Sequence, residues 1–244
     1  MKTKRIILIC LAIIFLVLFS YSLYKIIIWK NDNATNKKIQ EDTLKYVEVK
    51  DENESSEKEV YTVDFEELKK RNPDSSLYLK VNGTNINYVV VKTSNNSYYL
   101  KHNFDKEYNI SGWPFVDYSN KLDGTDRNII IYGHNTLDGT MFGTLKETLK
   151  EDWYNNEDNY IIPVVYDGKE EEYRVFSTYE IKVEDYYIKK NFENDTVYEE
   201  FLNSLKNRSV YDFGVTLNKN DKILTLSTCA DGGKRRVVLH AVKI

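Results

Sequence analysis

Cysteine is scarce in this sequence. Only Cys10 and Cys229 occur among the 244 residues. Two cysteines cannot build a disulfide framework, so a hydrophobic core must hold the folded domain together. Cys10 lies within an apolar N-terminal segment, whereas Cys229 ends the strand-like run 222–229. An unpaired thiol in an exported domain is better explained by chemical use than by packing.

The sequence also lacks an excess of positive charge. Its formal net charge is −4, and acidic and basic residues are mixed along the chain. A nucleic-acid-binding domain would concentrate lysine and arginine on one face, so we expect no nucleic-acid partner. There is no glycine-rich phosphate loop, zinc-type ligand spacing or calcium-loop pattern, and we therefore expect no metal or cofactor.

One long apolar run does occur, at the N-terminus. Residues 1–5 are basic, and residues 6–29 are predominantly apolar. This length is enough to cross a bilayer, and basic residues tend to stay on the cytoplasmic side. We predict a cytoplasmic N-terminus, a single-pass membrane anchor and an extracellular domain. The alternative is a cleaved signal peptide, but no small-x-small cleavage site follows the apolar run.

The part after the anchor divides into two segments. Residues 30–60 are polar and rich in Asn, Lys, Glu and Ser, and we interpret them as a stalk, in part helical. Residues 61–244 are long enough for one domain of ordinary size with its own core.

Short strand-like runs dominate this domain. Turn signals at Asn82-Gly83 and Asp167-Gly168 each separate two of them. We predict a mostly antiparallel β domain closed into a barrel, since many short strands need their edges covered. The predicted strands are 77–81, 86–91, 128–132, 161–166, 172–181, 222–228 and 236–244.

Three helices are predicted beside these strands. Residues 64–71 have an acidic start and a basic end, which suits the helix dipole. Residues 141–153 carry apolar side chains at a spacing of four, and residues 196–208 begin with the capping-box pattern Thr196-x-x-Glu199. Their apolar faces are expected to pack against the barrel.

Two residues at predicted strand ends could react together. Cys229 precedes a glycine-rich turn and three basic residues at 234–236, a setting that favours a thiolate. His134 follows the apolar strand 128–132 and Gly133, which allows close backbone approach. Taken singly, each has a structural explanation, as an inert buried thiol and an ordinary surface or core histidine. Together they form a candidate nucleophile and acid/base pair.

The other histidines and the arginines are ranked by position. His102 lies in a polar stretch and is expected to be exposed, and His240 lies within the last strand as a sheet residue. Arg235 and Arg236 alternate in a strand, so only one of them can face the thiol, and either could equally be a surface charge.

Several of these motifs, in this order, resemble the sortases, and among them class B. Thr225-Leu-Ser-Thr-Cys229, Tyr132-Gly-His134 and an arginine opening the final strand carry the resemblance over about residues 62–244. The further matching stretches are Asn82-Gly-Thr-Asn-Ile-Asn-Tyr88, Gly112-Trp-Pro-Phe-Val-Asp-Tyr118, Thr140-Met-Phe142 and the helical insert before the cysteine strand.

The resemblance implies an eight-stranded sortase-type barrel with an N-terminal helix and a long helix before the cysteine strand. It also implies a membrane-anchored cysteine transpeptidase of Gram-positive bacteria. Such an enzyme cleaves an NPQTN-like or related sorting signal of surface proteins after Thr. It then transfers the protein through a thioester to an amine of peptidoglycan or of its lipid-linked precursor.

Matching by motif position also implies roles for individual residues. Cys229 is the nucleophile and His134 the acid/base. Arg236 is the third catalytic residue, since Arg236-Val-Val-Leu-His-Ala241 fits the family strand better than a match from Arg235. Candidates for binding the signal are Asn96, Leu100, Tyr132, Tyr187, Ile188, Ser227 and Asp231. The short loop from Cys229 to Arg236, with Ala230 in place of an acidic residue, departs from the family and leaves signal preference open.

Two other functions use the same residues. A Cys-His cell-wall peptidase or amidase would release the acyl group to water and would usually orient its histidine with Asn, Asp or Gln. Asn135 is adjacent to His134 in sequence, which argues against that role. A membrane-tethered binding domain without catalysis would leave the combination of Cys, His and Arg unexplained.

Overall fold

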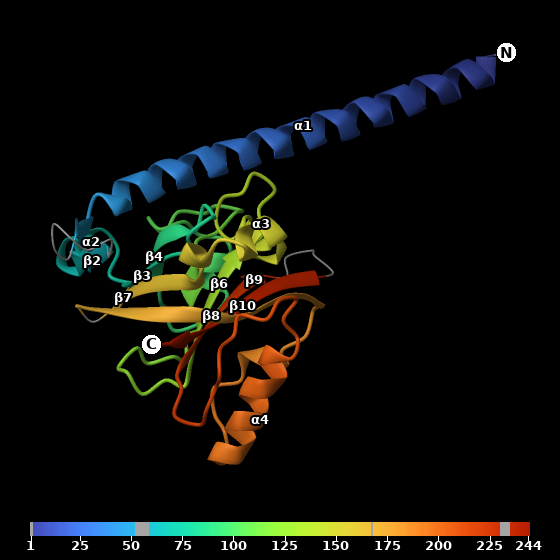
Figure 1. Ribbon diagram of the computed structural model, residues 1–244. Coiled ribbons are helices and arrows are strands. Elements are labelled where there is room, and N and C mark those ends of the chain that lie inside the picture. Colours follow the sequence, from blue (N-terminus) through green and yellow to red (C-terminus); the bar gives the residue numbers. More distant parts are fainter. Residues whose placement is uncertain (1, 52–58, 167, 230–234) are drawn as a thin grey trace.

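The computed structural model of the protein describes residues 2–51, 59–166, 168–229 and 235–244 (Figure 1). The helices are α1 (Lys2–Leu44), α2 (Phe65–Arg71), α3 (Glu151–Tyr154) and α4 (Asp195–Lys206). Short 3-10 helices are η1 (Tyr98–Leu100), η2 (Leu145–Leu149), η3 (Glu157–Tyr160) and η4 (Tyr186–Ile188). The strands are β1 (Val47–Asp51), β2 (Glu59–Val63), β3 (Ser75–Lys80), β4 (Asn87–Val91), β5 (Phe115–Val116), β6 (Asn128–His134), β7 (Ile161–Tyr166), β8 (Lys169–Lys182), β9 (Ile223–Cys229) and β10 (Arg235–Lys243).

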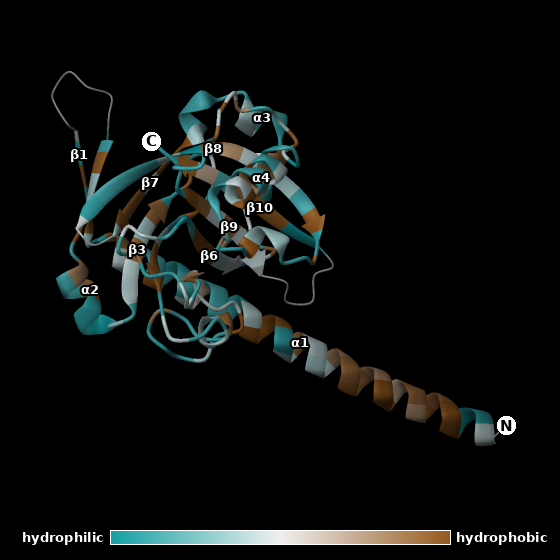
Figure 2. Ribbon diagram, turned by 90° about the horizontal axis from the view of Figure 1, so that it is seen from below, coloured by the Kyte–Doolittle hydropathy of each residue, from teal (hydrophilic) through white to brown (hydrophobic). Residues whose placement is uncertain are grey.

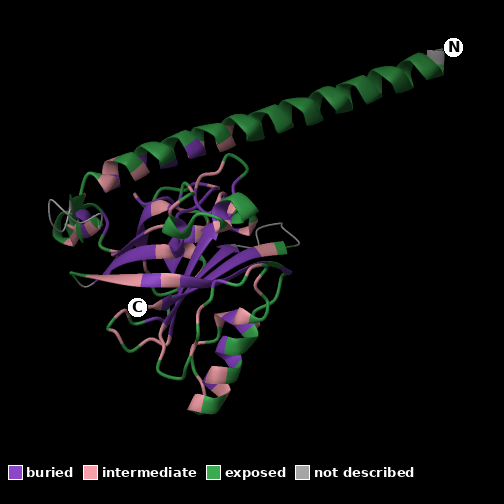
Figure 3. Cartoon of the chain, viewed as in Figure 1, coloured by how far each residue is buried: buried purple, intermediate pink, exposed green. Residues whose placement is uncertain are grey.

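Eight strands close into a barrel in the order β10-β8-β7-β3-β4-β5-β6-β9. The predicted closed barrel with peripheral helices is therefore confirmed. Most neighbours are antiparallel, but β4 pairs with β5 and β6 pairs with β9 in parallel. Every residue of β6 is buried (Figure 3). A strand flanked on both sides and covered on both faces has a continuous apolar run rather than an alternating one, and residues 129–131 show this pattern.

The predicted helix at 64–71 is confirmed, and the one at 196–208 is confirmed with a different start. Asp64 caps α2 by accepting a hydrogen bond from the Glu67 backbone N–H. Helix α4 begins at Asp195, because Asn194 accepts a hydrogen bond of 2.9 Å from the Val197 backbone N–H. The expected capping box at Thr196 is therefore wrong by two residues. An asparagine side chain satisfies the same orphan donors.

The predicted helix over 141–153 is wrong. The segment forms only η2 and the single turn α3, with Lys150 extended between them. Tertiary hydrogen bonds override the helical spacing here. The Met141 backbone N–H donates to the Tyr88 hydroxyl at 2.8 Å, and the Trp153 indole N–H donates to the Asn82 carbonyl at 2.8 Å. Trp153 thereby packs over Gly83, where a Cβ would lie 2.8 Å from the indole ring.

Helix α1 is long enough, and over its N-terminal part apolar enough, to cross a membrane. Figure 2 shows the apolar part projecting away from the domain, and Figure 1 shows the domain lying alongside the C-terminal part of the helix. The predicted stalk therefore begins as a continuation of α1 to Leu44. One face of this part packs on the domain through Asn33, Asn36, Ile39 and Thr43, all of which are buried.

The polar contacts of Asn36 hold this docked part of α1 in place. Its side-chain N–H donates to Asn109 Oδ1 at 3.1 Å and to the Gly112 carbonyl at 3.2 Å. In return, Asn109 Nδ2 donates to Asn36 Oδ1 at 3.0 Å. The amide pair satisfies both buried side chains at once, which is why a polar segment can pack tightly against the barrel.

We predict that Asn36→Ala lowers the free energy of unfolding by about 1–3 kcal/mol, because it removes the buried hydrogen bonds of Asn36 to Asn109 and to the Gly112 carbonyl. Urea unfolding of a soluble form starting at Lys30 measures this change. Asn31→Ala is the matched control, because Asn31 is an exposed amide on the same helix. Equal effects of the two substitutions would show that the amide pair does not fasten α1.

Candidate active site

The parallel pairing of β6 and β9 brings two sequence-distant strand ends together. Its register pairs Tyr132 with Ser227, Gly133 with Thr228 and His134 with Cys229. The last residue of each strand is therefore opposite the last residue of the other. Because the strands are parallel, both carboxyl ends meet at one end of the barrel, where chain direction changes and side chains can face a substrate.

His134 is held in a defined orientation. The side chain is 8% exposed, and Nε2 lies 2.8 Å from the carbonyl oxygen of Leu100. A carbonyl oxygen accepts but cannot donate, so Nε2 carries a proton in this contact and Nδ1 is the ring nitrogen that can exchange a proton. Leu100, expected to bind the signal, thus contacts His134 through its backbone.

Two glycines make room around this histidine. Gly112 has φ +59°, and a Cβ there would lie 2.3 Å from the Tyr99 carbonyl oxygen and 3.0 Å from His134 Cδ2. A Cβ on Gly133 would lie 2.5 Å from the Phe142 ring, which confirms the close approach expected at this position. Any larger residue at either glycine would displace the groups that position His134.

The two arginines at the start of β10 have different environments. Arg235 Nε lies 2.9 Å from the Glu180 carboxylate, and both side chains are largely exposed. Arg236 is partly buried, and its guanidinium donates to the Tyr187 hydroxyl at 3.0 Å. That hydroxyl lies 2.8 Å from Ser227 Oγ, so Arg236 faces the β9 side of the barrel. Its Nε is buried and has no hydrogen-bond partner in the described part of the chain.

The strand register also directs Arg236 toward Cys229. Val238 of β10 pairs with Ser227 of β9 in the antiparallel ladder. Continuing this register by two residues brings Arg236 opposite Cys229. The geometry therefore favours Arg236 over Arg235 as the arginine of the site.

Asp117 is a central residue that the sequence reasoning missed. It is buried and accepts hydrogen bonds from Asn96 at 2.9 Å and Tyr132 at 3.0 Å, and it pairs with Lys190 at 2.9 Å. Burial by itself raises the pKa of Asp117, but hydrogen bonds from Ser119, Lys190 and Asn96 outweigh it and lower the pKa to about 2. Its place in Gly112-Trp-Pro-Phe-Val-Asp-Tyr118, directly after β5, was the available signal.

The remaining candidates are distributed as follows. Asn96 and Tyr132 both donate to Asp117, and the Tyr187 hydroxyl contacts both Ser227 and Arg236. Ile188 is partly buried against the neighbouring apolar cores. Asp231 lies outside the described residues.

The other two histidines lie apart from this arrangement. His102 is half-buried rather than exposed, since its ring stacks on Tyr98 with the centroids 4.0 Å apart. His240 is fully buried, with hydrogen bonds to Thr225 and Tyr179, and burial lowers its pKa to about 3. It is a neutral sheet residue, as expected.

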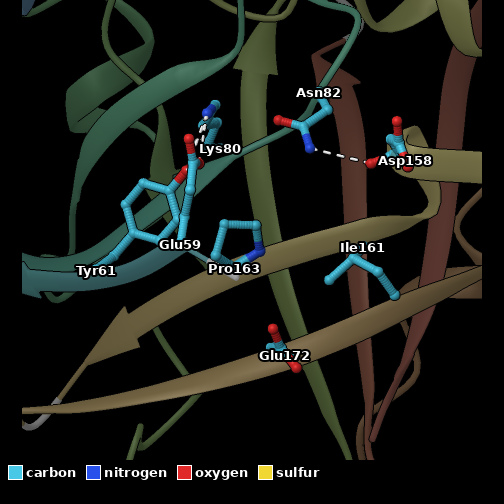
Figure 4. Close-up of a pocket in the computed structure, with 8 residues that line it drawn as sticks. All are labelled: Glu59, Tyr61, Lys80, Asn82, Asp158, Ile161, Pro163 and Glu172. Carbon is cyan, nitrogen blue, oxygen red and sulfur yellow. Dashed lines mark hydrogen bonds and ion pairs between the residues drawn. The ribbon is translucent and has the colours of Figure 1, made fainter. Parts of the chain in front are cut away.

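An open pocket of about 410 Å³ lies elsewhere, on β2, β3 and β7 (Figure 4). Its polar groups contact one another: Lys80 Nζ lies 2.9 Å from the Tyr61 hydroxyl and 3.2 Å from the Glu59 carboxylate. It includes none of the residues gathered around the ends of β6 and β9, so we assign it no role in catalysis.

Comparison with known proteins agrees with this geometry. The Sortase domain family model matches residues 79–244. The chain belongs to the sortase family. Sortase B of Staphylococcus aureus is 34% identical over 236 residues, which cover 95% of this chain and 92% of that protein. The class B assignment is supported by this relative and by the solved structures.

Two solved sortase B structures superpose on the barrel. The Staphylococcus aureus sortase B–substrate complex has a TM-score of 0.70 and 37% identity, covering 74% of this chain and 84% of the other. A sortase B complexed with a three-glycine ligand has a TM-score of 0.70 and 36% identity, covering 74% and 85%. The chain is therefore a class B sortase, a cysteine transpeptidase of cell-wall sorting.

We predict that Asp117 stabilises this sortase in a pH-dependent way. Its folded pKa of about 2 lies below the unfolded value near 3.9, so the stabilisation is fully present above the unfolded pKa and is lost as pH falls toward 2. Asp117→Asn should lower the free energy of unfolding at pH 7 by about 2 kcal/mol.

Urea unfolding at pH 7 and at pH 3 tests this. The difference between the native protein and Asp117→Asn should shrink at the lower pH. Glu180→Gln, which alters the exposed pair with Arg235, is the control and should change stability by less than about 1 kcal/mol. A difference for Asp117→Asn that stays constant with pH would contradict the assigned pKa.

Proposed function

We propose that Cys229 is the nucleophile, His134 the general acid and base, and Arg236 the group that stabilises the oxyanion. The observation that carries this proposal is the parallel register, which makes His134 and Cys229 neighbours at the ends of β6 and β9. The partly buried Arg236, whose Nε has no partner among the described residues, adds a fixed positive charge on the same side.

The reaction proceeds in two acyl transfers. The Cys229 thiolate attacks the Thr carbonyl of the signal, and the C–N bond breaks as His134 gives its proton to the departing amine. Arg236 stabilises the negative charge that develops on the carbonyl oxygen, a contribution of about 3–4 kcal/mol for one well-placed donor. An incoming amine then attacks the thioester, loses its proton to His134 and releases the Cys229 thiolate.

The Leu100 carbonyl supports this cycle by fixing one ring nitrogen. While Nε2–H donates to that carbonyl, only Nδ1 changes its protonation state, so the same nitrogen gives the proton in the first step and takes one in the second.

The substrate assigned to this site is an NPQTN-like or related sorting signal. The residues assigned to signal binding are Asn96, Leu100, Tyr132, Tyr187, Ile188 and Ser227, together with Asp231, which lies outside the described residues. Asp117 fixes Asn96 and Tyr132, which preorganises the polar side of this groove. The acceptor is an amine of peptidoglycan or its lipid-linked precursor, consistent with the glycine ligand of a related structure.

The cellular location assigned to the enzyme is the membrane, with the N-terminus in the cytoplasm and the catalytic domain outside. The apolar part of α1 is long enough to cross a bilayer and is not covered by the domain. Basic residues before it favour a cytoplasmic N-terminus.

The experiment that tests the activity uses peptides spanning NPQTN-like and LPXTG-like signals, each with and without a glycine-peptide acceptor. We expect cleavage after Thr, an amide product with the acceptor, and loss of both in Cys229→Ala. Cleavage to the free acid that ignores the acceptor would instead support a Cys-His hydrolase. No cleavage of any peptide would contradict the proposed substrate.

We predict that Arg236→Ala lowers kcat by about 100-fold or more, because it removes one donor to the oxyanion. Arg235→Ala is the matched control and should stay within about threefold of the native rate, since Arg235 pairs with Glu180 at the surface. Steady-state kinetics with the cleaved peptide measure both. A larger loss in Arg235→Ala would reverse the assignment of the two arginines.

A further inference from the structure

The domain contacts α1 before its apolar segment has ended. Ile26 and Ile27 are about half exposed, at 51% and 49%, whereas Ile28 and Trp29 are partly covered. The covered face then continues through Asn33 and Asn36. The part of the domain that covers this turn therefore lies at the level where the helix leaves the membrane.

Two loops of the domain are fastened to the next turn of α1. Asn33 Nδ2 donates to the Asp138 carboxylate at 2.5 Å, and the Ile110 backbone N–H donates to the Asp32 carboxylate at 2.8 Å. An exposed leucine or tyrosine lies within two residues of each of these attachment points in the sequence. Leu137 is 91% exposed, and Tyr108 is 67% exposed.

The distance along the helix places these side chains near lipid. Four residues separate Trp29 from Asn33, which is about 6 Å along a helix axis. The headgroup region of a bilayer is about 5–7 Å deep on each side of the hydrocarbon core. The loops attached at residues 32–33 therefore lie at the depth of the headgroups when α1 spans the membrane.

The chemistry of the two loops suits that depth. Tyrosine is enriched at membrane interfaces because its ring is apolar and its hydroxyl polar, and leucine gains by leaving water. The carboxylates of Asp32 and Asp138 are engaged by hydrogen bonds to the protein. Lys30 is exposed beside Trp29 and can contact lipid phosphates.

We propose that Tyr108 and Leu137 form a lipid-contacting surface that rests in the headgroup region of the membrane that α1 spans. This proposal rests on the proposed membrane anchoring of α1. Its occupant is the outer headgroup layer of the same bilayer. Together with α1, the two loops hold the domain at three points, which prevents it from rotating freely about a single tether.

The surface also bears on the active site. Leu137 follows His134 by three residues, so the histidine end of β6 is held close to the membrane. An acceptor amine carried on a lipid would reach the thioester at this level without leaving the bilayer surface. The contact therefore favours a lipid-linked acceptor over one in the distant cell wall.

The test measures the depth of single fluorophores on the full-length chain in phosphatidylcholine–phosphatidylglycerol vesicles. Cys10→Ala and Cys229→Ala remove the native thiols, and Leu137→Cys, Tyr108→Cys or Val49→Cys each adds one for labelling. Val49 is the matched control, because it is 52% exposed and follows the end of α1. The last residue of that helix, Leu44, lies about 22 Å along the helix axis from Trp29. The same dye at Val49 also reports any affinity of the dye itself for lipid.

Lipids carrying a nitroxide near the headgroup should quench labels at 108 and 137 by about twofold, as expected for side chains at headgroup depth, and leave the label at 49 unchanged. Protein that floats with the vesicles but shows no quenching at 108 or 137 would overturn the contact while leaving the anchor intact. Equal quenching at all three positions would contradict the assignment of Tyr108 and Leu137 as the lipid-contacting surface. Protein that does not float would refute the anchor, and the contact with it.

Discussion

The parallel pairing of β6 with β9 is the interaction on which the rest of the site depends. β7, β8 and α4 come between these strands in sequence, so the two become neighbours only when the barrel has closed. Closure brings His134 and Cys229 into register and, through β10, brings Arg236 to the same place. A shift of register by one residue would turn each side chain to the other face of the sheet. The proposed site therefore depends on the complete barrel rather than on a local motif.

A second set of contacts connects the site to the N-terminal helix. Asn36 of α1 binds Asn109 and the Gly112 carbonyl, and Gly112 packs against His134 and against the backbone of residues 99–100. The Leu100 carbonyl in turn accepts the hydrogen bond from His134. The docked part of α1 thus supports the loop that orients His134. Helix α1 is therefore also part of the scaffold of the proposed site, and its amides Asn33 and Asn36 are buried against the domain.

Sequence motifs predicted the barrel, which the structure confirms, because strand runs and turns depend on local signals. The same kind of signal supplied the residues of the proposed site. Apolar strand runs, turn residues and the motifs at 132–134 and 225–229 are readable without long-range contacts. The role of Asp117 could not be predicted from local signals. It depends on contacts with Asn96, Tyr132 and Lys190, which are distant in sequence and come together only in the folded domain. The segment 141–153 was misread because contacts with Tyr88 and Asn82 override its helical spacing. The docking face of α1 was missed because its buried residues are mostly amides rather than apolar side chains.

The central claim is that the thiol of Cys229 carries the acyl group while His134 moves the proton. Intact-mass spectrometry followed by peptide mapping, after brief mixing with a cleavable signal peptide, tests it most directly. We expect an adduct with the mass of the peptide up to Thr, located on Cys229 and removed when a glycine acceptor is added. Product formation with no adduct on Cys229, or with an adduct on another residue, would contradict the account.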